Sequence, residues 1–139
     1  MINFNYEIGL EPFEEAIYED WLLRILQSEG FLLGSLEYIF CGDAYLLKIN
    51  QDYLNHDTYT DIITFDYTEG KMVGGDVFIS VERVKENADQ YEVDFINELQ
   101  RVMAHGLLHL LGYKDKSKVE AALMRAKEEE KIKMFHVEQ

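Results

Sequence analysis

The segment 94–111 constrains the fold most, because it predicts a helix that is buried on nearly every side. Successive helical residues turn by about 100°, so positions four and seven apart share a face. Most of its surface is apolar, with Phe95, Leu99, Val102, Met103, Leu107, Leu108 and Leu111. The remaining stripe carries Glu98, His105 and His109, with Arg101 beside it. Polar groups on a buried helix require partners, so this stripe predicts a site inside the fold.

The first half of the chain predicts mostly strands. Apolar and polar residues alternate over 2–8, as in a half-buried strand. Residues 14–30 predict a helix with Pro12 in its first turn, Gly30 at its end and one apolar face, which carries Phe13, Ile17, Trp21 and Ile25. Residues 36–40 and 44–49 flank a Cys-Gly-Asp turn and predict a hairpin. A short helix over 51–56 and two strands over 61–67 and 71–80, which turn at Glu69-Gly70, follow.

The second half predicts helices. Ser80 is a candidate cap for a helix over 82–90 and Asp94 a candidate cap for the long helix, which Gly112 is expected to end. Ser117 and Glu120 have capping-box spacing and predict a last helix over 121–133. The predicted strands cluster in the first half of the chain and the predicted helices in the second half. This order favours an α+β fold with one mixed sheet of about four to five strands and about five helices.

Composition sets the class of protein. At 139 residues, with 47% apolar residues, the chain is predicted to be a single domain, 1–139. Cys41 is its only cysteine, which excludes an internal disulfide and a thiolate metal cluster and indicates a small buried hydrophobe. No signal peptide or membrane-spanning apolar run is recognisable, so a cytoplasmic protein is expected.

The net charge of −14 argues against a polyanionic partner. However, residues 1–100 hold 5 Lys and Arg against 21 Asp and Glu, whereas residues 101–139 hold 8 against 6. A solvated mixed-charge helix over 126–133 accounts for most of these basic residues. Lys114, Lys116 and Lys118 lie closest to the histidine pair in the sequence and are the better candidates for function.

His105 and His109 have the i, i+4 spacing with which one helix face binds a metal ion, as in zinc hydrolases. Gly112 lets the chain turn back, and Asp115 follows within reach of the same ion. Three protein ligands and an open fourth position are typical of a catalytic site. The alternative, two core histidines bonded to backbone carbonyls, is weaker, because Gly106 costs about 1 kcal/mol within a helix and indicates close backbone approach. Gly106 also replaces the glutamate of HExxH peptidases, so peptidase activity is not expected.

These residues resemble the YbeY family, bacterial rRNA maturation factors that are metal-dependent, single-strand-specific endoribonucleases. The family signature HGxLHLxGYDH matches residues 105–113, and its EAxxM segment matches Glu120, Ala121 and Met124. Residues 60–65 resemble its TDVLSF strand, residues 75–80 its GDI-type strand, and Asn50 and Tyr53 the segment before them. Two departures from the pattern matter. Asp115 stands where the family has its third metal histidine, and Leu54 where it commonly has an arginine thought to handle RNA.

The resemblance implies a zinc-dependent hydrolase that cleaves single-stranded or ribosomal RNA, with the ribosome as a further partner and neither DNA nor membrane. One divalent ion, zinc, would be held by His105, His109 and Asp115, since a carboxylate also binds zinc. Candidate RNA-binding residues are Lys114, Lys116 and Arg101. Candidate catalytic residues are Glu98, Asp61 and Thr60, although Glu98 is alternatively a surface ion pair with Arg101, and Asp61 and Thr60 alternatively cap a strand. His56 and His136 are given no role.

Two rival functions stay open. One is a metallohydrolase with a substrate other than nucleic acid, which the acidic charge would suit. The other is a ribosome-associated factor whose metal only stabilises the fold.

Overall fold

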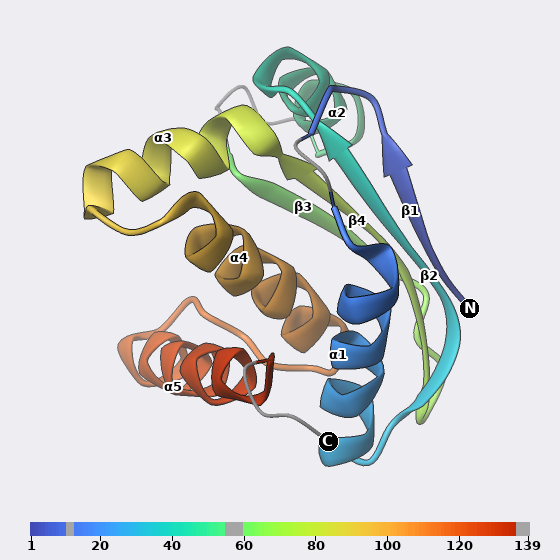
Figure 1. Cartoon of the computed structure of the whole chain (residues 1–139). Coiled ribbons are helices and arrows are strands. Elements are labelled where there is room, and N and C mark those ends of the chain that lie inside the picture. Colours follow the sequence, from blue (N-terminus) through green and yellow to red (C-terminus); the bar gives the residue numbers. More distant parts are fainter. Residues whose placement is uncertain (11–12, 55–59, 136–139) are drawn as a thin grey trace.

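The computed structural model describes residues 1–10, 13–54 and 60–135 (Figure 1). Pro12, His56 and His136 therefore lie outside the described residues. The described elements are β1 (Ile2–Tyr6), α1 (Glu15–Ser28), β2 (Leu32–Cys41), α2 (Asp43–Leu54), β3 (Ile62–Asp66), β4 (Met72–Ser80), α3 (Val81–Tyr91), α4 (Phe95–Leu110) and α5 (Lys118–Phe135). None of the described helices has the length and apolar character needed to cross a membrane.

The four described strands form one mixed sheet in the order β1-β2-β4-β3. β1, β2 and β4 are parallel, and β3 pairs antiparallel with β4, with Ile62 opposite Ile79. The predicted α+β fold with one mixed sheet and five helices is confirmed. β3 is an edge strand, so the residues at its start lie at the rim of the sheet.

The helices cover the two faces of the sheet unequally (Figure 1). α1 and α4 pack on one face, and α5 packs on both of them. The main core lies between these helices and the sheet and includes Trp21, Tyr38 and Leu107. A smaller cluster lies under α2 on the other face and includes Cys41, Leu46 and Ile63. Alternate residues of the strands therefore face different cores: Val77 and Ile79 of β4 lie in the main core, whereas Phe78 packs against the smaller cluster.

Gly106 places α4 close to the sheet. A Cβ atom added at Gly106 would lie 2.7 Å from Cδ1 of Ile62 and 2.8 Å from Cγ1 of Val77. Any larger residue would therefore force Ile62, Val77 or α4 itself to shift. The predicted close backbone approach is found, and it brings the histidine stripe of α4 to the start of β3.

Several local predictions are confirmed. Ser80 caps α3 by accepting a hydrogen bond from the backbone N–H of Arg83. Ser117 and Glu120 form a reciprocal capping box at the start of α5. Gly112 has a φ of +104°, which lets the chain leave α4 in a left-handed turn. Asp94 occupies the N-cap position of α4 but makes no side-chain cap hydrogen bond.

The predicted hairpin around Gly42 is wrong, because residues 44–49 belong to helix α2. α2 buries Leu46, Ile49 and Asn50, a helical spacing that a strand would not produce. Distant contacts fix its start. The carboxylate of Asp43 accepts hydrogen bonds from Oγ of Ser80 at 2.6 Å and from the guanidinium of Arg83 at 2.9 Å. A local pattern cannot reveal partners that lie so far along the chain.

Two predictions of burial are also wrong. Ile17 is 47% exposed, since α1 buries the neighbouring face with Tyr18, Trp21 and Ile25. Residues 126–133 are not merely a solvated helix, because α5 buries Glu128 and Lys131 against α4 and α1. The indole N–H of Trp21 donates to the carbonyl of Lys131 at 2.7 Å, which ties α5 to α1.

Candidate metal centre

His105 and His109 point from adjacent turns of α4 toward the chain that follows Gly112. Their Nε2 atoms are 2.9 Å apart. Oδ2 of Asp115 lies 3.2 Å from Nε2 of His105 and 3.4 Å from Nε2 of His109. The structure thus brings the three predicted ligands together at the C-terminal end of α4.

The spacing of these three atoms fits a tetrahedral zinc ion. Zinc bonds of about 2.0–2.2 Å at tetrahedral angles place ligand atoms roughly 3.3–3.6 Å apart. The three distances, 2.9, 3.2 and 3.4 Å, lie within or slightly below that range. The ligand atoms would have to move outward by only a few tenths of an ångström to surround the ion.

The hydrogen-bond partners of the two histidine rings also fit a metal site. Nδ1 of His105 lies 2.5 Å from the carboxylate of Glu128, and Nδ1 of His109 lies 3.0 Å from the carbonyl of Tyr113. Both partners accept hydrogen bonds, so we assign a proton to each Nδ1. Each Nε2 then presents a lone pair, and the Asp115 carboxylate adds another. Three electron-pair donors that converge in this way can hold a cation between them.

Glu128 is the residue of this centre that sequence reasoning missed. It comes from α5, its side chain is 2% exposed, and it contacts both His105 and Arg101. Burial alone would raise the pKa of the Glu128 carboxyl. The hydrogen bond from His105 and the charge of Arg101 nevertheless hold this pKa below its usual value. Glu128 therefore stays ionised. One signal was available, because Met124, Glu128 and Lys131 repeat at the spacing of a buried helix stripe.

Arg101 connects three carboxylates around the centre. Its guanidinium lies 2.6 Å from Glu98, 3.2 Å from Glu128 and 3.9 Å from Asp61. The pKa of Arg101 is raised because Glu98 and Glu128 outweigh the effect of burial. The alternative ion pair between Glu98 and Arg101 is present, but Glu98 is buried, at 3% exposure, and not on the surface.

Asp61 borders a hollow of about 210 Å³ together with His105 and Asp115. Burial raises the pKa of the Asp61 carboxyl above its usual value, although the charge of Arg101 opposes this shift. Asp61 is thus a carboxylate beside the centre that is not one of the three convergent ligands. The hydroxyl of Thr60 donates to the carbonyl of Ile62 at 3.3 Å, which fits a strand-capping role.

The predicted RNA-binding residues lie in different surroundings. Lys114 and Lys116 are exposed on the turn on either side of Asp115. Arg101 is already held by two carboxylates, so its guanidinium has less capacity for a phosphate. Leu54 is 41% exposed at the end of α2. It carries no charge, whereas the family that the sequence resembles commonly has an arginine at this position.

Comparisons with known proteins place the chain in a family. The model of the family described as endoribonuclease YbeY matches residues 5–136. Two curated proteins named endoribonuclease YbeY are similar over the whole chain. The protein of Flavobacterium johnsoniae is 58% identical over 139 residues and that of Flavobacterium psychrophilum 57%, covering 100% and 99% of those proteins.

A solved structure has the same fold. The solution structure of a protein from Thermotoga maritima superposes with a TM-score of 0.67 at 25% identity, over 97% of this chain and 89% of that one. The family model, the full-length relatives and the fold agree, and the chain belongs to the endoribonuclease YbeY family.

Proposed function

We propose that the protein is a metal-dependent endoribonuclease that cleaves single-stranded RNA during ribosomal RNA maturation, with one zinc ion held by His105, His109 and Asp115. The convergence of three lone-pair atoms within 3.4 Å of one another carries this proposal. Nitrogen and carboxylate oxygen donors in this number suit zinc with one coordination position left for water or substrate. When bound, the ion would polarise the scissile phosphate and lower the pKa of a water molecule.

The surrounding residues would orient the ligands and handle the proton. Glu128 fixes the ring of His105 by accepting its Nδ1 proton in a hydrogen bond, as carboxylates beside zinc-binding histidines do. Asp61 is the carboxylate best placed to receive a proton, because it borders the same hollow and burial raises its pKa. Glu98 would act through Arg101, whose guanidinium it holds, and Thr60 would shape the start of β3.

The partners follow from the same proposal. Ribosomal RNA or its precursors would be the substrate, with the ribosome as a further partner, and the chain 1–139 would act as one domain in the cytoplasm. The continuous core that joins the sheet to α1 and α4 supports a single domain.

One experiment separates this proposal from its two rivals. The zinc-loaded protein should cleave a single-stranded RNA, leave an RNA duplex and single-stranded DNA intact, and lose activity with a chelator while circular dichroism shows the fold retained. Loss of the fold together with the metal, without RNA cleavage beforehand, would favour the ribosome-associated factor. A stable metalloprotein that cleaves no RNA would favour another hydrolytic substrate.

A further inference from the structure

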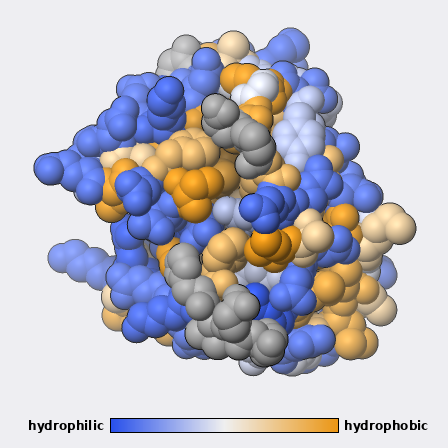
Figure 2. All heavy atoms as spheres, viewed as in Figure 1, coloured by the Kyte–Doolittle hydropathy of each residue, from blue (hydrophilic) through white to orange (hydrophobic). Residues whose placement is uncertain are grey.

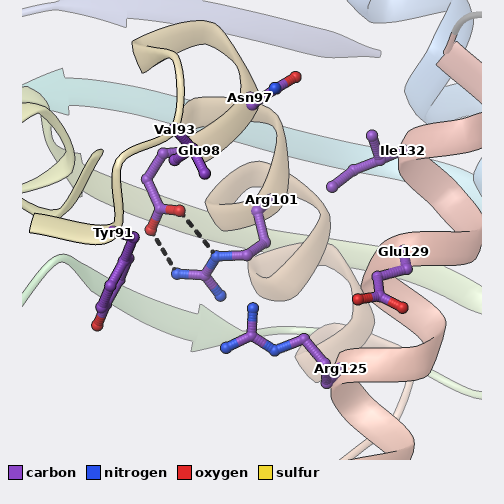
Figure 3. A pocket seen from close by; sticks show the side chains of 8 residues that line it. All are labelled: Tyr91, Val93, Asn97, Glu98, Arg101, Arg125, Glu129 and Ile132. Atoms are coloured by element: carbon purple, nitrogen blue, oxygen red, sulfur yellow. Dashed lines mark hydrogen bonds and ion pairs between the residues drawn. The ribbon is translucent and has the colours of Figure 1, made fainter. Parts of the chain in front are cut away.

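A hollow of about 490 Å³ lies beside the metal centre, between the α3–α4 connection, α4 and α5. Figure 3 shows its walls, with Tyr91 on one side and Arg125 and Ile132 of α5 on the other. In the space-filling view, a notch between the tip of α3 and α5 is rimmed by hydrophilic residues, with hydrophobic surface beside it (Figure 2). Its volume lies in the range of about 300–1,000 Å³ that is usual for small-molecule sites.

Arg125 is the second arginine that borders this hollow, beside Arg101. Its side chain is exposed and, within the ranges that the structure describes, takes part in no ion pair or hydrogen bond. Figure 3 shows its guanidinium pointing toward Arg101, the residue with which it borders the hollow. Arg101 is already neutralised by Glu98 and Glu128. An anion that enters here would therefore meet Arg125 as its free partner.

Arg125 also connects the hollow to the metal centre. A second hollow of about 190 Å³ is bordered by Arg101 and Arg125 together with His105 and Asp115. The two hollows share both arginines. A phosphate on Arg125 would thus lie between the convergent ligand atoms and the larger hollow.

The larger hollow has the chemistry of a nucleoside site. Tyr91 is 57% exposed and offers an aromatic face, on which any base can stack. Ile132 adds an apolar wall, and the amide of Asn97 offers a donor and an acceptor. The carboxylate of Glu129, one turn along α5 from Arg125, can accept hydrogen bonds from ribose hydroxyls or base amino groups. Among the described residues, this hollow thus combines a stacking surface, hydrogen-bonding groups and a cation without an ion-pair partner.

We propose that this hollow binds the nucleotide adjacent to the scissile phosphate of single-stranded RNA, with Arg125 on its phosphate and Tyr91 against its base. The proposal rests on the proposed ribonuclease function and assigns a substrate subsite to residues of α3 and α5. It also explains how an acidic chain offers a positive contact beside its metal ligands.

Mononucleotides test the site without requiring cleavage. The zinc-loaded protein is titrated by NMR with adenosine 3′- and 5′-monophosphate, with adenosine and with inorganic phosphate. We expect the signals of Tyr91, Asn97 and Arg125 to shift with at least one monophosphate, and to shift less with adenosine or phosphate alone. The variant Arg125→Gln should weaken monophosphate binding roughly tenfold, as for a hydrogen bond to a charged group, but leave adenosine binding unchanged. The variant Tyr91→Leu should weaken both about fivefold.

RNA kinetics provide the second measurement. In Arg125→Gln, the KM for single-stranded RNA should rise. The slope of log KM against log salt concentration should decrease by about 0.7, as expected when one phosphate is no longer bound. Lys133→Gln is the matched control, because it removes the same charge from an exposed position on α5. Zinc content should be the same in wild type and in both variants.

The outcomes separate the two proposals. The subsite proposal would be overturned if the NMR signals that shift with monophosphates belong to residues away from the hollow. Equal salt slopes of KM in Arg125→Gln and Lys133→Gln would also overturn it. Nucleotide binding in the hollow by a wild-type protein that cleaves no RNA would overturn the proposed function and leave a nucleotide site unrelated to cleavage.

Discussion

The carboxylate of Glu128 on α5 accepts a hydrogen bond from Nδ1 of His105 on α4, over a distance of 2.5 Å. The two residues are 23 positions apart in the sequence, and Glu128 is almost fully buried. Because Arg101 holds the second oxygen of Glu128, the carboxylate has little freedom to rotate. The contact orients the imidazole so that Nε2 points at His109 and Asp115.

Replacing Glu128 should therefore weaken metal binding. We expect Glu128→Ala to lower the zinc affinity about 10- to 100-fold, as removal of such a partner does in other zinc sites. Glu128→Gln should lower it less, since the amide oxygen still accepts the Nδ1 proton. Zinc affinity is measured by competition with a chromogenic chelator. The control is Glu129→Ala, an exposed neighbour outside the centre, and equal affinities in the three variants would show that Glu128 has no positioning role.

Only part of the metal centre could be predicted from the sequence. His105, His109 and Asp115 lie within one segment, so the helical period and one turn suffice to bring them together. Glu128 and Lys131 look like solvated charges because the run 126–133 is charged almost throughout. Their partners lie on α4 and at the end of α1, and only the packing of three helices decides which of these charges become buried.

Gly106 should not tolerate a side chain. Gly106→Ala places a methyl group against Ile62 and Val77, and overpacking of this kind costs about 1–3 kcal/mol. The better helix propensity of alanine offsets about 1 kcal/mol of this cost, so a net loss of up to about 2 kcal/mol in the free energy of unfolding is expected. Denaturant titration measures this. Gly9→Ala is the control, since nothing lies within 4 Å of its added Cβ, and a loss as small as in that control would contradict the close approach.

α2 illustrates why part of the fold could not be predicted. Residues 44–49 are apolar enough for a strand, and the preceding Gly42 suits a hairpin turn. The contacts of Asp43 with Ser80 and Arg83 stabilise the start of the helix, and they form only when β4 and α3 are in place. By contrast, the caps of α3 and α5 use partners three residues away and were readable from the sequence.

The ion pair between Glu29 and Lys131 should make stability depend on pH. Burial alone would raise the pKa of Glu29, but the hydrogen bonds from Lys131, Tyr113 and Lys127 lower it from 4.5 to about 2. The stabilisation is thus fully present above pH 4.5 and is lost as the pH falls toward 2. Glu29→Gln should cost about 3 kcal/mol at pH 7, the lower end for a broken buried ion pair, and progressively less in acid.

The measurement is denaturant unfolding of wild type and Glu29→Gln between pH 7 and pH 3. Glu130→Gln serves as the control, because Glu130 also contacts Lys131 but is exposed and should contribute little. A difference between wild type and Glu29→Gln that stays constant with pH would mean that the Glu29 charge does not stabilise the fold.

Lys114 and Lys116 remain candidates for RNA binding at the exposed turn. Replacing both by alanine should weaken binding of single-stranded RNA and reduce the logarithmic salt slope by about 0.7 for each phosphate that the variant no longer binds. Binding is followed by fluorescence anisotropy at several salt concentrations, with the chelator-treated protein so that the RNA stays intact. An unchanged slope would identify these lysines as solvated charges.

The sharpest prediction concerns Asp115, which stands where the family pattern has histidine. If its carboxylate is the third ligand, Asp115→Ala should weaken zinc binding substantially and leave α4 intact, because Asp115 follows the helix and its side chain is 36% exposed. That exposure also leaves room for an imidazole, so Asp115→His should retain or strengthen zinc binding. Asp115→Asn separates charge from geometry, since its amide oxygen can reach the ion but brings no negative charge. The expected order of zinc affinity is His and Asp above Asn, and Asn above Ala. An alanine variant with undiminished affinity would remove Asp115 from the centre, leaving the carboxylate to stabilise only the turn after Gly112.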